Sequence, residues 1–407
     1  MNSTATVVPS TGIAGQTTSA RVVSIDIFRG LTMAVMIFVN DLASVHGLSK
    51  WTYHMPANID AMTYVDMVFP AFLFIVGMSL PLAVRHRLRR NPSLGALWLH
   101  IALRSLALVA LGLILANVHD ADAARMRISP YLWAVLGLVG GILLWNVYSG
   151  INARTVQVLR LTGGALLVFV FSVFRRSTPA GESWLNFSYP EILGLIGLTY
   201  FAVCVLYVPT RRWRLAPLAW LIVLISYNVA CAGHWLRLDP PIYIWPFGNG
   251  CLPSLVMAGV VTSLIFLDDV GPTRSMQRVR LGLLLALLCF VAGWLLRPFG
   301  ISKIRATPTW ALWSIAASVL LFTVLYWICD VKKTTRWAWL VRPAGSNTLL
   351  TYLIPDLYYF VTAWTATAYL LGHWDQGWPG VLRAVAFTAA MLLIAHGATK
   401  ARLRMQL

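Results

Sequence analysis

The feature that most constrains this chain is a succession of uninterrupted apolar segments, each about 20 residues long. A segment of that length crosses the hydrocarbon core of a bilayer as a helix, because a helix satisfies its own backbone where no water is present. About twelve candidate spans of this kind follow one another along the chain. They lie near 25–45, 64–84, 97–116, 129–149, 156–174, 190–209, 215–233, 251–268, 279–297, 309–329, 346–369 and 378–398. The sequence therefore predicts an all-α polytopic membrane bundle of about 11–12 transmembrane helices.

Composition supports this class. Hydrophobic residues make up 58% of the 407 residues and charged residues only 11%, whereas a soluble domain is nearer half apolar and a quarter charged. The first twenty residues are small and polar and show no periodicity. We therefore expect a disordered tail over 1–20 and one membrane-embedded domain over 21–407.

The net charge of +18 raises the question of a nucleic-acid partner. Lysines and arginines are instead concentrated in short connections, about twice as many in one alternating set as in the other. That bias predicts an integral membrane protein with both termini cytoplasmic and no nucleic-acid partner. The five cysteines are scattered and form no CxxC pair, so no metal site or disulfide framework is indicated.

Several polar residues stand at membrane depth near the first span. Asp26 and Arg29 are spaced to share a helical face, where they either neutralise each other or anchor a polar ligand that enters from the cytoplasm. Gly30 beside them permits a close helix approach. Asn40 and Asp41 follow at the other end of the span, as a solvated terminus or as part of a site.

His54 stands in the loop between the first two spans, which the charge bias places outside the cytoplasm. It is either a surface histidine or a catalytic base or acyl carrier oriented by the nearby Asp60 and Asp66. Thr63 and Asp66 also fit a capping box at the start of the second span, and Asp66 could serve both purposes.

Further along, Glu191 in YPEILGLIGLTY fits a helix start. Lys303 and Arg305 lie on the side where the bias disfavours cations, which indicates a bound anion or carboxylate partner, or snorkelling. Asn347 lies in an apolar span behind Ser346 as the expected N-cap, and its amide should have a partner.

Two segments, SIDIFRGLTMAVMIFVND and TYVDMVFPAFLFIVGMS, together resemble the heparan-α-glucosaminide N-acetyltransferase family of transmembrane acyltransferases and its bacterial, DUF5009-like relatives. The resemblance is close over residues 21–85 and weaker around ISK…TPTWALW, LYWICD and GSNTLLTY. The loop differs from the family pattern: HMPANIDAMT is two residues longer than H-A-x-W-x-G-x-T and lacks its Trp-Gly.

The resemblance implies a bundle that takes acetyl-CoA as co-substrate from the cytoplasm and acetylates an amino sugar or glycan on the far side. The loop histidine of the family falls on His54, with Asp66 beside it as the second catalytic residue. The implied substrate and CoA contacts are Asp26, Arg29, Asn40, Asp41, Lys303 and Asn347. The bacterial relatives imply a bacterial-type inner (plasma) membrane. No metal is expected, the lipid bilayer is the surrounding partner, and a homodimer is left open. A secondary transporter of a small polar solute is the alternative, although the halves show no matching Gly/Pro breaks.

Overall fold

A computed structural model describes residues 23–179, 181–236, 245–267, 274–369 and 371–405. The tail predicted over 1–20 lies outside the described residues. The regular structure of the described chain is almost entirely helical, and the two short strands form a hairpin outside the predicted spans.

The helices are α1 (Val23–Leu42), α2 (Val68–Arg90), α3 (Leu94–Asn117), α4 (Pro130–Trp145), α5 (Ala153–Val173), α6 (Glu191–Thr210), α7 (Ala216–Ala232), α8 (Cys251–Phe266), α9 (Ser275–Leu295), α10 (Pro308–Tyr326), α11 (Val341–Ser346), α12 (Thr348–Thr365) and α13 (Gly377–Lys400). The strands are β1 (Arg176–Thr178) and β2 (Gly181–Ser183), which pair antiparallel. Short 3-10 turns occupy Lys50–Thr52, Val65–Met67, Arg297–Phe299 and Arg336–Ala338, and a π turn occupies Trp327–Val331.

Each predicted span coincides with one of these helices, and α11 is a short additional helix before α12. Within the described residues, 8 helices are long and apolar enough to cross a membrane, by length and composition, and α4, α7 and α8 are shorter apolar helices. The predicted all-α polytopic membrane bundle is therefore confirmed as a fold class.

The centre of the bundle is formed where α2 crosses α8 in backbone contact. A Cβ on Gly77 would lie 1.8 Å from the Val256 carbonyl oxygen, and one on Gly259 would lie 2.0 Å from that of Phe74. Only glycine permits this approach, and small residues at such crossings let membrane helices pack tightly. The phenylalanines around the crossing are buried and in ring contact across α1, α2, α8 and α10: Phe28, Phe74, Phe266 and Phe322.

A second close contact joins α1 to α11, as the sequence predicted for Gly30. A Cβ there would lie 2.0 Å from the Val341 carbonyl oxygen. The expectation for Ser346 was wrong: Ser346 ends α11, and Asn347 is the N-cap residue of α12.

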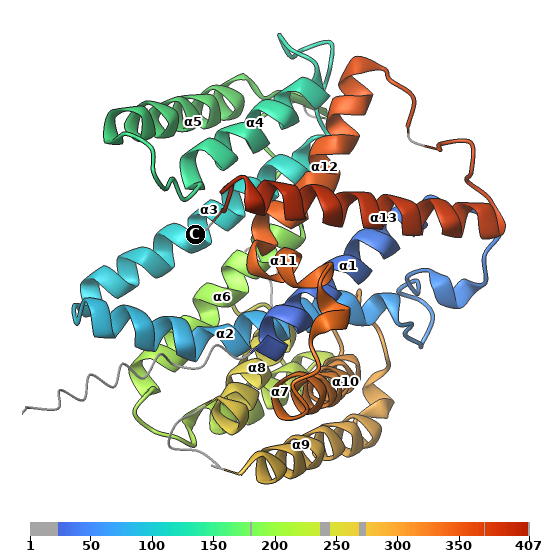
Figure 1. The fold of residues 1–407 in the computed structure, drawn as a ribbon. Coiled ribbons are helices and arrows are strands. Elements are labelled where there is room, and N and C mark those ends of the chain that lie inside the picture. The colour runs from blue at the N-terminus through green and yellow to red at the C-terminus, as the bar shows by residue number, and fades with distance from the viewer. Residues whose placement is uncertain (1–22, 180, 237–244, 268–273, 370, 406–407) are drawn as a thin grey trace, which may run out of the picture.

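Figure 1 shows α5 and α9 at opposite edges of the molecule. In the most apolar 18-residue stretch of each helix, only 17% of α5 and 28% of α9 is buried, against 61% in α1 and in the stretch that contains α2. The outer helices thus present apolar side chains to the surroundings, as lipid-facing helices do. The inner helices, by contrast, also carry ionisable residues, such as Asp26 and Arg29 on α1 and Arg104 on α3.

Candidate active site

Two connections far apart in the sequence meet at one end of the bundle: the segment from α1 to α2 and the segment from α9 to α10. Asp60 in the first accepts hydrogen bonds from the Ile301 backbone N–H and, at 3.4 Å, from the Arg305 guanidinium. Gly300, with φ +83°, lies where a Cβ would come within 2.9 Å of the Asp60 carboxylate. Asp60 therefore joins the two connections. The sequence had suggested that Asp60 could orient His54, but the two side chains are not in contact in the described structure.

His54 lies against Asp66 at this junction. Its Nδ1 is 2.7 Å from Asp66 Oδ1, with the Asp66 side chain 1% exposed and that of His54 47% exposed. A carboxylate can only accept, so this contact favours the tautomer with the proton on Nδ1. The lone pair of the ring is then on Nε2.

Asp66 is held by its surroundings in a fixed position. Its Oδ2 accepts from the backbone N–H groups of Thr63 at 3.0 Å and Met55 at 3.3 Å. The Thr63 hydroxyl donates to the Tyr53 carbonyl oxygen at 2.9 Å and lies 3.3 Å from the same Oδ2.

The capping box predicted for Thr63 and Asp66 is only half formed. The carboxylate accepts from the Thr63 N–H, but Thr63 precedes a 3-10 turn over Val65–Met67, and the N-cap residue of α2 is Met67. Asp66 therefore orders the connection from inside, as well as contacting the imidazole.

Lys303 reaches His54 from the α9–α10 connection. Its Nζ lies 3.3 Å from Nδ1 and 3.4 Å from Nε2 of the ring. Because Nδ1 faces Asp66, Nε2 is the nitrogen that can accept from the ammonium. Burial lowers the pKa of Lys303, and the carboxylates of Asp66 and Glu191 oppose that change.

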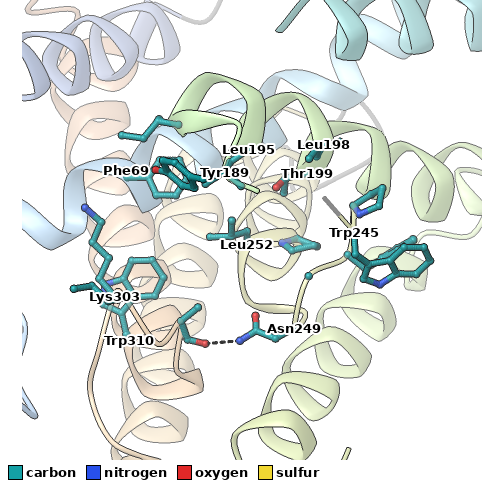
Figure 2. Close-up of a pocket in the computed structure, with 17 residues that line it drawn as sticks. Phe69, Tyr189, Leu195, Leu198, Thr199, Trp245, Asn249, Leu252, Lys303 and Trp310 are labelled. Carbon is teal, nitrogen blue, oxygen red and sulfur yellow. Dashed lines mark hydrogen bonds between the residues drawn. The ribbon is translucent and has the colours of Figure 1, made fainter. Parts of the chain in front are cut away.

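The conformation of the Lys303 segment is fixed from the neighbouring helices. Ala306 has φ +48°, and its carbonyl oxygen accepts from the amides of Asn228 at 3.0 Å and Asn249 at 3.1 Å. A positive φ at a residue with a Cβ persists only where the surroundings determine it. Figure 2 shows the hydrogen bond that Asn249 donates. It also shows Lys303 on the opposite side of the pocket from Trp245.

Lys303 also lines a cavity of about 340 Å³, which we call the aromatic pocket. Its walls come from the start of α2, the start of α6, and the connections before α6, α8 and α10. The rings on its surface are Phe69, Tyr189, Trp245, Phe247 and Trp310. The pocket thus combines flat apolar faces with the Lys303 amine and the Asn249 amide.

Glu191 lies beside this pocket at the first position of α6, with φ +58°. Its Oε2 accepts from the Leu193 N–H at 3.0 Å and from the Tyr352 hydroxyl at 3.1 Å. Glu191 is therefore more than the helix start that the sequence suggested, since it connects α6 to α12.

A larger cavity of about 610 Å³, the basic cavity, lies within the bundle among α1, α2, α3, α6 and α12. Its basic lining residues are Arg29, Arg87, His100 and Arg104. The Arg104 guanidinium lies 4.9 Å from the centre of the Tyr200 ring. Along α2 the lining runs from Phe72 to Arg87, so the cavity extends for about 22 Å at 1.5 Å per residue.

Arg29 has a structural part in this cavity. It donates to the Gly345 carbonyl oxygen at 3.1 Å and to the Ser79 hydroxyl at 2.7 Å, and it lies 3.8 Å from Asp26. Asp26 itself lines a neighbouring cavity of about 450 Å³, which shares Ser346 with the basic cavity.

Three of the other candidate residues lie elsewhere. Asp41 is buried against Arg383, with Oδ2 3.3 Å from its Nε, while Asn40 is exposed on α1. The Asn347 amide donates to the Leu403 carbonyl oxygen at 2.8 Å and to Thr399 at 3.2 Å. Asn347 thus has the partner that the sequence required, in the C-terminal segment.

Sequence reasoning passed over Arg104 and His100. Both stand inside the span predicted over 97–116, and an ionisable residue at that depth is itself a signal of function. Tyr352 carried no such signal, because a tyrosine in an apolar span is unremarkable until its hydroxyl is seen to meet Glu191.

The fold and these sites define a polytopic membrane protein with an accessible histidine–carboxylate pair at one end of its bundle and a basic cavity inside. The chain belongs to the family described as "Domain of unknown function (DUF5009)", whose sequence model matches residues 21–236, just over half of the chain.

Curated relatives confirm the resemblance predicted from the sequence. The chain is 38% identical over 97 residues to heparan-alpha-glucosaminide N-acetyltransferase of Homo sapiens, and 37% identical over 93 residues to that of Mus musculus. These matches cover 24% and 23% of this chain but only 14% and 13% of the relatives. The matched part thus spans far less than two thirds of either relative.

Proposed function

We propose that this protein is a membrane acetyltransferase that moves an acetyl group from acetyl-CoA to the amine of an amino sugar or glycan. The contact between His54 and Asp66 carries the proposal, because it leaves the basic lone pair of the imidazole on Nε2, next to Lys303 in the wall of the aromatic pocket. The names of the curated relatives support the reaction type.

Two routes use the same nitrogen. In direct transfer, the acceptor amine attacks the thioester carbonyl, Nε2 takes the amine proton, the C–S bond breaks, and the departing thiolate receives that proton. In the covalent route, Nε2 attacks the thioester and CoA leaves as the thiolate. The amine then attacks the acetyl carbonyl, the acetyl–imidazole bond breaks, and Nε2 takes the amine proton and passes it to the thiolate. Both routes give an acetylated amine and free CoA.

Lys303 is well placed for either route. Its ammonium lies within 3.4 Å of the ring nitrogens, where it can stabilise negative charge that develops on the acetyl carbonyl oxygen. Asp66 holds the ring and its tautomer and would stabilise the imidazolium formed in the direct route.

The basic cavity suits the donor. Arg87, His100 and Arg104 offer donors to the phosphates of CoA, while the apolar lining farther along, including Phe72 and Leu193, suits the pantetheine arm. The neighbouring cavity that contains Asp26 adds Arg342, Lys400, Arg402 and Arg404 beside Ser346, which suits the nucleotide. The bias of basic residues supports a cytoplasmic position for this end.

The aromatic pocket suits the acceptor. Ring faces such as those of Trp245 and Trp310 pack against the apolar C–H face of a sugar, while the Asn249 side chain can pair with hydroxyl groups. A pocket of about 340 Å³ accommodates one or two sugar rings and not a long polymer.

The test is transfer of label. Purified protein is incubated with acetyl-CoA labelled in the acetyl group and a panel of amino sugars, and their N-acetylated analogues serve as blocked controls. We expect label in amino sugars alone. A trapped, acid-labile acetyl group on His54 in the absence of acceptor would identify the covalent route. Absence of labelled product across the panel, from protein that binds acetyl-CoA, would contradict the proposed acceptor class.

The donor site has its own test. Arg104→Gln should weaken acetyl-CoA binding about ten- to a hundredfold, the loss of one charged hydrogen bond. Arg90→Gln is the matched control, since Arg90 is exposed at the end of α2 and is not among the residues that line the basic cavity. Equal affinity in the two variants would remove Arg104 from the donor site.

A further inference from the structure

The arginines at the end of α2 separate onto two faces of the helix. Arg87 lines the basic cavity, whereas Arg85 and Arg89, one turn apart, line a different cavity of about 380 Å³. Arg211 and Arg214 reach this second cavity from the α6–α7 connection. We call it the arginine pocket, and no acidic side chain occurs among the described residues that line it.

The remaining walls of the arginine pocket are apolar or aromatic: Pro81, Val84, Leu88, Tyr207, Trp213, Pro217 and Leu264. Trp213 is 71% exposed, and Leu215, two residues further on, is 76% exposed. A tryptophan and a leucine exposed beside arginines are typical of the interface between lipid and water, where aromatic rings and basic residues gather.

The arginine pocket also lies at the N-terminal end of α7, a helix with exposed apolar side chains. α7 begins at Ala216, two residues after Arg214, without a side-chain N-cap. Leu218 and Ile222, one turn apart on α7, are 41% and 59% exposed. Leu218 and Ile222 therefore form an exposed apolar ridge that begins next to the arginines and follows α7. The positive end of the α7 dipole lies in the same region.

We propose that the arginine pocket binds the phosphate-bearing headgroup of an anionic phospholipid, with an acyl chain along the exposed face of α7. Arginine side chains recognise phosphate with paired donors, and basic pockets between membrane helices suit such headgroups. A soluble phosphate would use the arginines but leave the apolar ridge without a role. The acetyl donor has its own cavity on the other face of α2, so this inference is independent of the proposed enzymatic activity.

The experiment uses the full chain, purified in detergent, and measures lipid binding by native mass spectrometry and by the rise in thermal midpoint. The probes are phosphatidylglycerol, phosphatidylcholine as the zwitterionic counterpart, and inorganic phosphate and acetyl-CoA as soluble phosphates. Arg89→Gln/Arg214→Gln is the test variant, because both side chains are exposed and line the pocket. Arg212→Gln is the matched control, since Arg212 is exposed in the same connection but is not among the lining residues.

We expect phosphatidylglycerol to bind and stabilise the wild type and Arg212→Gln alike, and phosphatidylcholine to do neither. The double variant should bind phosphatidylglycerol roughly 25-fold more weakly, because each arginine in contact with the headgroup contributes a factor of about five. Leu218→Asn/Ile222→Asn should weaken lipid binding as well, while leaving the arginines in place.

Four results would overturn the proposal: equal affinity in wild type and double variant, an equal loss in Arg212→Gln, equal binding of the zwitterionic lipid, or displacement of the lipid by inorganic phosphate or acetyl-CoA. The last would identify the arginine pocket as a site for a soluble phosphate. If the double variant does not fold, Arg89→Gln alone is compared with Arg212→Gln, with an expected loss of about fivefold.

Discussion

Two buried aspartates lie in the first 70 residues, and each contacts a basic side chain. The partner of the first comes from the last helix, and the partner of the second comes from the connection between α1 and α2. Asp41 meets Arg383 of α13, and Asp66 meets His54. The two carboxylates are equally buried, at 1% exposed, but their partners differ: the Arg383 side chain is 4% exposed and that of His54 is 47% exposed.

The hydrogen bonds around the two carboxylates show the same contrast. Around Asp41, Oδ1 accepts from the hydroxyls of Tyr359 and Tyr369 while Oδ2 faces Arg383, and Phe387 packs against both tyrosines. This cluster is closed to substrate and joins α1, α12 and α13. Around Asp66, the imidazole that the carboxylate contacts is still accessible. A buried acid indicates chemistry only where its partner can be reached from outside.

The largest expected effect separates the accessible pair from the closed one. His54→Ala should lower the rate of acetyl transfer by about 10²–10⁴, the usual contribution of a general base, and by more if an acetyl group is carried on the ring. Acetyl-CoA binding and the thermal midpoint should stay near those of the wild type, because His54 is half-exposed. Retained transfer by a folded His54→Ala protein would defeat the mechanism.

The closed pair should respond in stability. Arg383→Ala leaves the Asp41 carboxylate buried without its cation, which typically costs 3–5 kcal/mol. Thermal or denaturant unfolding in detergent measures this loss. The double variant Arg383→Met/Asp41→Leu should recover much of it, because no uncompensated charge is left. An unchanged unfolding midpoint in Arg383→Ala would show that the pair does not hold α13 to α1.

Asp66→Asn tests which of its two contacts matters more. The amide can still accept, but it can also donate to Nδ1 and so favours the wrong tautomer, with a fall in rate of about 10–10². The backbone N–H groups of Thr63 and Met55 would still find an acceptor, so the loss of stability should be about 1 kcal/mol. A rate equal to that of the wild type, together with a lower midpoint, would assign Asp66 to ordering the connection alone.

The spans could be predicted from the sequence because each depends on a local property, the length of an apolar run. The same holds for Gly30, whose small size at a membrane helix surface favours a close contact, seen here with Val341.

The arrangement of the site could be predicted only in part. The proximity of Asp66 to His54 follows from a short sequence separation, but Lys303 lies 249 positions from His54. Asp41 and Asn347 looked like site residues because an isolated polar group at depth is costly. Their partners Arg383 and Leu403 come from the end of the chain, and local sequence cannot distinguish a satisfied polar group from a functional one.

The smallest expected effect is a shift in pH dependence at Lys303. Its pKa is lowered from the ordinary 10.5 by burial, so it loses its charge at a lower pH than an exposed lysine. If that charge stabilises the reacting carbonyl, the rate should fall on the alkaline side, beginning below pH 10.5. Lys303→Arg keeps its charge to higher pH, so the alkaline fall in rate should begin at a higher pH. Lys303→Met carries no charge at any pH, so this fall should be absent and the rate should be lower at every pH.

The contribution of Lys303 to stability should change in the opposite direction to the rate, and increase as the pH rises over the same range. Between the lowered folded-state pKa of Lys303 and 10.5, the unfolded chain holds the extra proton, and unfolding therefore becomes less favourable as pH rises. A wild type that loses activity while its unfolding midpoint gains relative to Lys303→Met would show that the lost activity comes from the charge beside His54 and not from unfolding. A parallel fall of both in wild type and Lys303→Met would mean that the alkaline limb belongs to another group. Asp41 and Arg383 should contribute nothing to this difference, because their contact does not involve Lys303 and no substrate reaches it.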